Sequence, residues 1–176
     1  SILNVSQVDF ASLYARVEEV RADISMFREI VLNSILPLIQ VAEVMAQKYD
    51  VVVTNPPYMG NGGMGQKLSN YVKVAYPNSK SDLSTVFMEH TLKMCKRNGY
   101  MSMINIPVWM FLSSYEKLRE DLLRNTTLRN MLHLGRGVFG SDFGTTAFVF
   151  SRSFTPNYRA NYRRLFEKQG AVDSLS

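Results

Sequence analysis

The sequence has very little cysteine and histidine. Cys95 is its one cysteine, and His90 and His133 are its two histidines. A single cysteine excludes an internal disulfide bond, and three such residues are too few for a cluster of soft metal ligands. Cys95 is expected to be a small buried side chain rather than a nucleophile. Disulfide-linked folds and zinc sites are therefore excluded, and no metal is expected.

A leader sequence, a long apolar run, internal repeats and low-complexity segments are also missing. Without a leader or a run of membrane-spanning length, the chain is predicted to be cytoplasmic and to have no membrane partner. Apolar residues make up 46% and charged residues 20% of the 176 positions. This composition can fill one core and excludes a disordered chain.

Positive charge is concentrated after residue 50. Residues 1–50 carry four basic and seven acidic side chains, whereas residues 51–176 carry sixteen basic and eight acidic ones. In the tail, residues 154–176, basic residues alternate with aromatic ones. That pattern suits a phosphate backbone and exposed bases. A solvated surface segment fits the tail equally well.

Hydrophobic periodicity predicts a helical segment over residues 1–47. Helix is expected from residue 7, with Pro37 breaking or kinking it into two helices. Its expected apolar face consists of Val17, Val20, Ile24, Phe27 and Val31. Residues 1–47 are therefore interpreted as a helical segment that leads into the first strand.

An alternation of strands and helices follows. The predicted elements are a strand over Tyr49–Thr54, a polar glycine-rich loop over 58–80, a helix over 82–97, a strand over 100–106, a helix over 113–124 and strands over 128–134 and 145–151. This order predicts an α/β fold whose sheet is mostly parallel and closes with an antiparallel hairpin.

Local signals set the helix boundaries. Ser81 or Asp82 can cap the helix over 82–97, and Gly99 can end it. Ser113 and Glu116 have the spacing of a capping box. The expected buried sides are Leu83, Phe87, His90 and Met94 in the first helix, and Tyr115, Leu118 and Leu122 in the second.

The first strand ends within VVVTNPPY, residues 51–58, and the two prolines of this segment restrict the backbone that carries its polar groups. Ligands of open α/β sheets bind beyond the carboxyl ends of strands, and prolines restrict the backbone there. The Asn55 amide oxygen and the Pro56 carbonyl are acceptors without a proton to release, so together they suit an –NH₂ group. Tyr58 offers a ring on which a planar base can stack. The motif predicts catalysis by positioning an amine.

A strand followed by Asn-Pro-Pro-Tyr resembles the catalytic motif of N6-adenine DNA methyltransferases of the gamma motif order. The resemblance continues through SDLSTVFMEHTLKMCKRNGYMSMINIPVWMF and YEKLREDLLRNTTLRNMLHLGRGVFGSDFGTTAFVFSRS, and it covers residues 48–153. YDVVVTNPPYMG with its polar loop is most similar to BREX phage-exclusion and type IIG restriction-modification methyltransferases. The resemblance implies the C-terminal, catalytic part of a Rossmann-like methyltransferase sheet.

The resemblance also implies roles for individual residues. The catalytic set is Asn55, Pro56, Pro57 and Tyr58. Asn55 and Pro56 would accept hydrogen bonds from the N6 amine of a flipped-out adenine, and Tyr58 would stack on its ring. In the family an aromatic residue of the closing hairpin touches the extruded base. Phe139 in GVFG is the matching position here, with Phe143 as a second candidate.

Five further residues are candidates with an ordinary structural alternative. Trp109 follows a strand end, where lining the base pocket and packing in the core both fit. Lys67 and Lys73 are possible phosphate contacts or plain surface lysines. Asp82 and Phe87 could approach the cofactor, although capping and core packing explain them as well.

S-adenosylmethionine is the implied cofactor, but its glycine motif is missing from the sequence. In this class the motif precedes the catalytic strand, so it is expected before Ser1. GNGGMG has no helix signal directly after it, and GVFGSDFGTT leads into a strand, so neither fits. The chain is therefore expected to be an inactive fragment that binds the cofactor weakly or not at all. Micromolar binding in calorimetry would contradict this expectation.

Double-stranded DNA is the expected partner, with defence-system proteins as further partners. The tail over 154–176 is expected to lead to a target-recognition domain. Other NPPY enzymes methylate a protein glutamine amide or guanine N2 in RNA, and the motif alone cannot separate these substrates. A non-catalytic DNA-binding fragment, in which NPPY is an ordinary turn, remains the other alternative.

Overall fold

The computed structural model describes residues 8–22, 26–138 and 144–167 of the chain. The chain divides into two compact units, residues 1–48 and residues 49–176.

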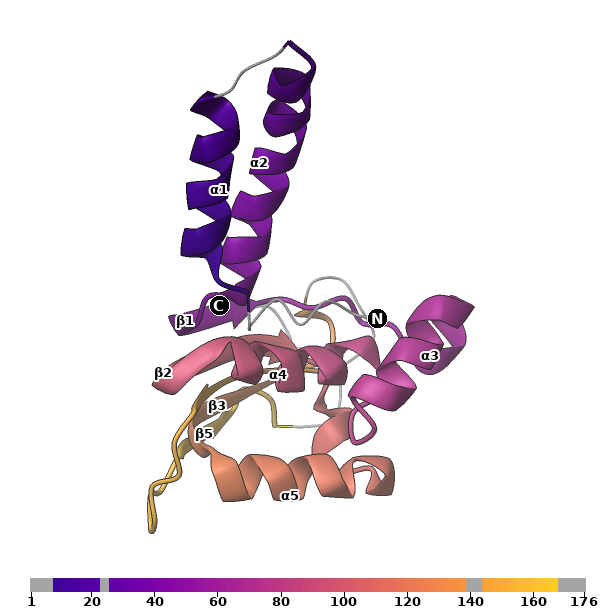
Figure 1. The fold of residues 1–176 in the computed structure, drawn as a ribbon. Coiled ribbons are helices and arrows are strands. Elements are labelled where there is room, and N and C mark those ends of the chain that lie inside the picture. The colour runs from indigo at the N-terminus through magenta and orange to yellow at the C-terminus, as the bar shows by residue number, and fades with distance from the viewer. Residues whose placement is uncertain (1–7, 23–25, 139–143, 168–176) are drawn as a thin grey trace. The chain divides into compact units, whose positions relative to one another are not determined.

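The first unit is a pair of helices, α1 (Phe10–Ala22) and α2 (Met26–Ala46). They pack along each other (Figure 1), and the Tyr14 hydroxyl donates to Glu43 Oε2 at 2.7 Å. Two helices were expected, but the division at Pro37 was wrong, because Pro37 lies inside α2. Leucine, alanine and methionine around it favour helix strongly enough to offset one missing hydrogen bond. Of the expected apolar face, Val17 is buried and Val31 is 38% exposed.

The α2 helix is longer and more apolar than was predicted from the sequence. Its segment Arg28–Ala46 is, by length and composition, apolar enough to cross a membrane. The expectation that no run reaches this length was therefore wrong. Within the described residues this segment is not buried, and Leu38 and Met45 are 68% and 64% exposed. Length and composition alone do not separate a membrane span from an interior helix.

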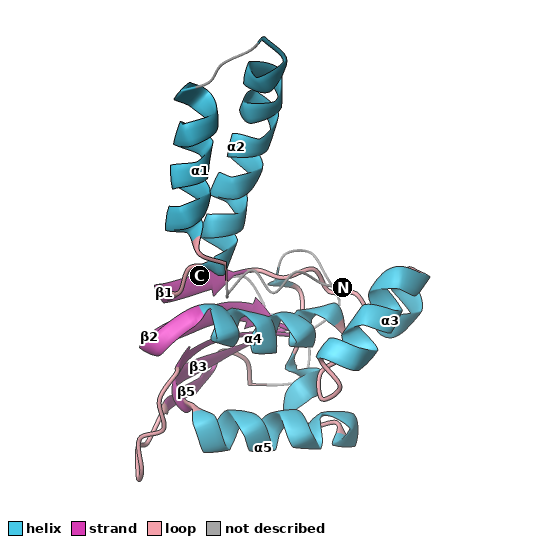
Figure 2. Cartoon of the chain, viewed as in Figure 1, coloured by secondary structure: helices cyan, strands magenta, loops and turns pink. Residues whose placement is uncertain are grey.

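The second unit is built on a five-stranded sheet (Figure 2). Its strands are β1 (Tyr49–Thr54), β2 (Cys95–Asn105), β3 (Thr127–Gly135), β4 (Thr145–Ser151) and β5 (Asn161–Arg164), in the order β1-β2-β4-β3-β5. β1 runs parallel to β2 and β3 parallel to β5, while β4 is antiparallel to both of its neighbours. The predicted α/β class and the antiparallel pair of β3 and β4 are confirmed. β5, in the tail, was not predicted.

Helices α4 (Leu83–Met94) and α5 (Glu116–Asn125) lie on one face of this sheet (Figure 1). Alternate residues of a strand point to opposite faces, so every second residue of β2 and β4 enters the core beneath the helices. The most buried members of this core are Met88, Met101, Met103, Leu118 and Phe148. On the opposite face of the sheet, Tyr100 of β2 and Val51 and Val53 of β1 are exposed.

The segment after the NPPY motif is not the continuous loop that was predicted. It contains a 3₁₀ turn, η2 (Asn61–Gly63), and helix α3 (Gln66–Ala75). Leu68 and Val72 recur at helical spacing and pack with Met64 and Val86 in a second small cluster. The glycines and polar residues around this short apolar pattern concealed it.

The boundary between α4 and β2 also differs from the prediction. α4 ends at Met94, and β2 begins at Cys95 instead of residue 100. Gly99 lies inside the strand, so its predicted role as a helix stop was wrong. A Cβ at Gly99 would approach the carbonyl oxygens of Asp50 and Tyr49 to 2.9 and 3.0 Å. The glycine therefore permits the close approach of β1.

Helix caps and buried faces were predicted with mixed success. Asp82 caps α4, as expected. The capping box was wrong, because Ser113 starts a separate 3₁₀ turn, η4 (Ser113–Tyr115), and Tyr115 precedes α5 without a side-chain cap. The buried residues predicted for the second helix are confirmed. On the predicted side of α4, Leu83 and Phe87 are partly buried against the two clusters, whereas the fully buried positions are Ser84, Thr85, Val86, Met88 and Thr91. Hydrogen bonds to backbone carbonyls allow its threonines to be buried.

Candidate active site

The NPPY motif lies directly beyond the carboxyl end of β1. Thr54, the last residue of β1, is in register with Met103 of β2. Asn105, where β2 ends, is in register with Thr146 near the start of β4, and Gly135 at the end of β3 is in register with Thr145. The carboxyl ends of β1, β2 and β3 and the amino end of β4 therefore meet at one edge of the sheet. In α/β folds this edge binds ligands.

Tyr58 and Asn55 are in direct contact at this edge. The Tyr58 hydroxyl donates to Asn55 Oδ1 at 3.1 Å and lies 3.3 Å from the carbonyl oxygen of Ile104 in β2. Asn55 is exposed, Tyr58 is 37% exposed, and Pro56 is buried. Partial burial raises the pKa of the Tyr58 phenol, so the hydroxyl keeps its proton and remains a donor at neutral pH.

Backbone hydrogen bonds hold the segment that follows the motif. The Leu83 amide donates to the Met59 carbonyl at 2.8 Å, and the Asn61 amide donates to the Ser81 carbonyl at 3.0 Å. Gly60 and Asp82 form an isolated antiparallel bridge between these two contacts. The motif is thus fixed on one side by β1 and on the other by the start of α4.

Asn105 fixes the end of β2 and was missed in the sequence. Its side chain is fully buried; Nδ2 donates to the Ser84 carbonyl at 3.2 Å, and Oδ1 accepts from the Ile106 amide at 2.7 Å. The Thr146 hydroxyl donates to its carbonyl at 3.1 Å. Asn105 therefore ties α4 and β4 to the strand that carries the Ile104 carbonyl. An asparagine within the apolar run MINIP was the available signal.

The two residues expected near the cofactor have structural roles. Asp82 is 8% exposed, and its Oδ1 accepts from the amide and the hydroxyl of Ser84 at 2.8 and 2.6 Å. Phe87 is half-buried against the main core and makes an edge-on ring contact with His90. Neither position conflicts with a cofactor nearby, and capping and packing account for both.

Substitution of Asp82 by alanine is expected to lower the free energy of unfolding by about 1–2 kcal/mol, because it removes the helix cap and leaves buried Ser84 unpaired. Urea denaturation measures the change. Asp50→Ala is the matched control. It removes the exposed Asp50–Lys96 ion pair, which has an N–O distance of 2.9 Å, and should leave the free energy of unfolding nearly unchanged. Equal losses in the two variants would contradict the capping role.

The remaining sequence candidates lie in different environments. Trp109 is 5% exposed, within the core, with its ring centroid 5.5 Å from that of Phe148. Lys67 and Lys73 are exposed on α3. Phe139 and Phe143 lie outside the described residues, in the connection between β3 and β4, whose described ends reach the edge that carries NPPY.

The GNGGMG segment was rejected as a ligand loop because no helix signal followed it, and that reason was wrong, since α3 begins at Gln66. Some of its amides are nevertheless engaged within the chain. Gly63 donates to the Gly60 carbonyl at 2.9 Å and Met64 to the Asn61 carbonyl at 3.3 Å. The second rejected segment leads into β4, as expected.

Cys95 is fully buried, and burial raises the pKa of its thiol, which disfavours the nucleophilic thiolate. Among the described residues, no group of three or more histidine, cysteine, aspartate or glutamate side chains could hold a metal ion.

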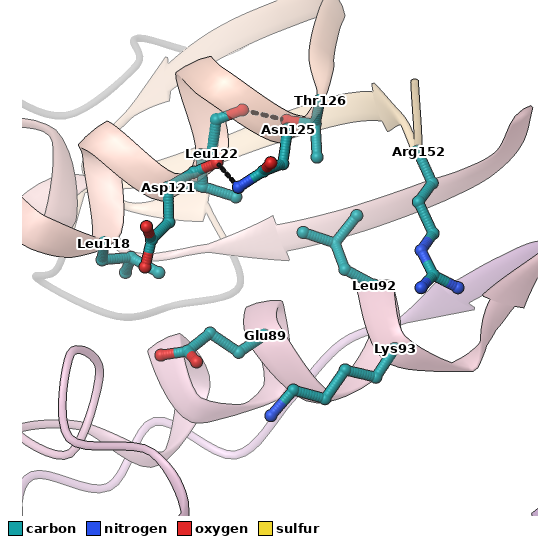
Figure 3. A pocket seen from close by; sticks show the side chains of 9 residues that line it. All are labelled: Glu89, Leu92, Lys93, Leu118, Asp121, Leu122, Asn125, Thr126 and Arg152. Atoms are coloured by element: carbon teal, nitrogen blue, oxygen red, sulfur yellow. Dashed lines mark hydrogen bonds between the residues drawn. The ribbon is translucent and has the colours of Figure 1, made fainter. Parts of the chain in front are cut away.

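A pocket of about 190 Å³ opens between α4 and α5, and Figure 3 shows its lining. Glu89, Leu92 and Lys93 come from α4, and Leu118, Asp121 and Leu122 come from α5. Its lining residues include none from the NPPY motif or from the ends of β1 and β2. This pocket is therefore separate from the candidate active site.

Comparison with known proteins identifies the family. The model of the Eco57I restriction-modification methylase family matches residues 10–139. Adenine-specific methyltransferase BrxX of Escherichia coli O9:H4 (strain HS) is 41% identical over 95% of this chain. Adenine-specific methyltransferase PglX of Lacticaseibacillus casei (strain Zhang) is 42% identical over 74% of this chain. The chain spans 14% and 11% of the lengths of these two relatives.

Solved structures support the same fold. A structure from a type I restriction-modification system matches 73% of this chain and 26% of its own chain, with a TM-score of 0.55 and 22% identity. The type ISP restriction-modification enzyme LlaGI, in complex with a DNA substrate mimic, matches 83% of this chain and 17% of its own, with a TM-score of 0.53 and 14% identity. With the fold, the NPPY edge and the family match in agreement, the chain belongs to the Eco57I restriction-modification methylases.

Proposed function

We propose that the chain provides the amine-binding part of a methyltransferase that modifies the N6 position of adenine in DNA, within a restriction-modification or phage-defence protein. The observation that carries the proposal is the position of Asn55 and Tyr58, in contact at the carboxyl edge of β1. The relatives BrxX and PglX, both named as adenine-specific methyltransferases, support adenine over other amine substrates.

In the proposed reaction, Asn55 Oδ1 and the Pro56 carbonyl oxygen accept the two hydrogens of the adenine amine. This directs the nitrogen lone pair at the incoming methyl group. Pro57 restricts the backbone between Asn55 and Tyr58, and the Tyr58 ring stacks on the flipped-out base. The nitrogen would gain the methyl carbon as the carbon–sulfur bond of the donor breaks and a neutral thioether leaves, and it would then lose one proton to solvent. No side chain has to act as a strong base, because positioning and hydrogen bonding supply the catalysis.

S-adenosylmethionine is the proposed cofactor and, when bound, supplies an electrophilic methyl group on a positively charged sulfur. Asp82 and Phe87 are the described residues proposed to lie nearest to it. Both belong to α4 or its cap, and α4 starts beside the segment that follows Tyr58. Oδ1 of Asp82 takes both cap hydrogen bonds, which leaves Oδ2 to accept from a ligand.

Double-stranded DNA is the proposed partner. Lys67 and Lys73 are exposed on α3 and are proposed to contact phosphates. Phe139 and Phe143 are proposed to touch the extruded base, whereas the burial of Trp109 favours a core role for it. A cytoplasmic location and defence-system partner proteins are proposed together with the DNA substrate.

Methyl transfer from labelled S-adenosylmethionine tests the proposal. The full-length protein that contains residues 1–176 would be incubated separately with duplex DNA, RNA and bacterial protein. Label is expected in DNA, and digestion to nucleosides should place it on N6-methyladenosine. Sequencing of the modified DNA would then give the target site. Label in RNA or protein but not in duplex DNA would contradict the proposal.

A further inference from the structure

Asparagine presents two ends of nearly the same shape, an oxygen that accepts hydrogen bonds and an –NH₂ group that donates them. Asn55 binds an amine only if its oxygen faces the base. The residue is exposed and follows the last residue of β1, so the strand does not choose between the two orientations. Some other contact must do so.

The Tyr58 hydroxyl is the group positioned to make that choice. It is a donor held between two oxygen acceptors, Asn55 Oδ1 at 3.1 Å and the Ile104 carbonyl at 3.3 Å. The Ile104 carbonyl is fixed, because the next residue, Asn105, is buried and hydrogen-bonded on three sides. The hydrogen bond to Asn55 Oδ1 is the contact that places the Asn55 oxygen, and not its –NH₂ group, on the Tyr58 side.

The base is expected on that same side. Tyr58 stacks on the base in the proposed function, so an Asn55 oxygen directed at Tyr58 also faces the edge of the stacked ring. The Asn55 oxygen has two lone pairs, so it can accept from the arriving amine while the Tyr58 hydroxyl still donates to it. Neither the hydroxyl nor the Asn55 oxygen then loses a hydrogen-bond partner.

We propose that the Tyr58 hydroxyl is a specificity-determining group that orients Asn55 as an acceptor, so that the site takes a purine with a 6-amino group and rejects one with a 6-oxo group. This inference rests on the proposed function. An oxo group would face the Asn55 oxygen, acceptor against acceptor, and sites built around a hydrogen bond reject analogues that cannot make it. Tyr58 acts here through Asn55, as a positioning residue, in addition to stacking.

The test uses two duplexes of the methylated site, one with the target adenine and one with hypoxanthine in its place. Fluorescence anisotropy gives the dissociation constants of both with the full-length protein. The ratio of the hypoxanthine to the adenine constant measures discrimination. In Tyr58→Phe, which keeps the ring, the ratio is expected to fall about fivefold, as for the loss of one orienting hydrogen bond. The easier flipping of mispaired hypoxanthine affects both proteins equally and cancels.

A second background separates orientation from a general loss of structure. Aspartate at position 55 has two equivalent acceptor oxygens, so Asn55→Asp has no amide orientation to lose. Adding Tyr58→Phe to Asn55→Asp should therefore leave the ratio unchanged. Tyr58→Trp, which stacks but lacks the hydroxyl, replaces Tyr58→Phe if that variant does not fold, and it should show the same fall in the native background.

Each result bears on one claim. If the wild-type protein methylates adenine and Tyr58→Phe keeps the wild-type ratio, the orienting role is overturned and the proposed function stands. An equal fall in both backgrounds also overturns it, because the effect would not pass through the Asn55 amide. Failure of the wild-type protein to methylate adenine contradicts the proposed function instead.

Discussion

Substitution of Asn55 by alanine in the full-length protein is expected to lower methyl transfer to adenine by about two to three orders of magnitude. The variant keeps the Pro56 carbonyl but loses the side-chain acceptor that would hold the amine, and removal of one such preorganised group typically costs this much. Asn55 is exposed and its contact is with Tyr58, so the fold should be unaffected. Single-turnover transfer of a labelled methyl group measures the loss.

Two comparisons make this result specific. Binding of S-adenosylmethionine by Asn55→Ala, measured by calorimetry, should stay close to that of the wild-type protein. Asn130→Ala is the matched control, because Asn130 is an exposed asparagine on β3, and its activity should remain within about twofold, as for ordinary surface substitutions. Wild-type rates in Asn55→Ala would exclude the proposed mechanism.

The sheet edge that carries NPPY could be predicted because its signals are local. Three β-branched residues followed by two prolines define the end of β1 regardless of the rest of the chain. The β3 and β4 strands were also predicted within one or two residues of their observed ends. A strand end in an α/β protein is a ligand edge, so the position of Asn55 and Tyr58 followed directly.

The parts that were predicted wrongly depend on contacts between distant segments. Gly99 has the local appearance of a helix stop, and only the close approach of β1 explains its place in β2. Helix α3 is short and surrounded by glycines, and it is stabilised by packing against Val86, which lies in α4. Local propensity cannot report such contacts, which often override it.

Side-chain roles at the site show the same limit. Trp109 fits a base pocket by its position after β2, but its ring packs on Phe148 and Phe150. Asn105 has no recognisable motif, and its importance comes from hydrogen bonds to α4 and β4. The contact between Tyr58 and Ile104 spans 46 residues, so no local pattern could reveal it.

Substitution of Phe148 by alanine is expected to lower the free energy of unfolding by about 3–5 kcal/mol. Phe148 is 1% exposed at the centre of the sheet, in register with Met103 of β2 and Met131 of β3. Its ring lies 5.5 Å from those of Trp109 and Phe150, so truncation leaves a cavity that these large neighbours cannot close. Urea denaturation followed by tryptophan fluorescence reports the change, since Trp109 is the one tryptophan.

Phe154→Ala is the matched control, because Phe154 is 60% exposed and its removal should cost less than about 0.5 kcal/mol. Similar losses in both variants would contradict the assignment of the core. The two large effects also differ in kind. In the full-length protein, Phe148→Ala should methylate normally well below its lowered unfolding midpoint, because Phe148 is in the core of the sheet and is not part of the NPPY motif. Asn55→Ala should keep its loss of about two to three orders of magnitude at every temperature at which it is folded, which separates stability from chemistry at this site.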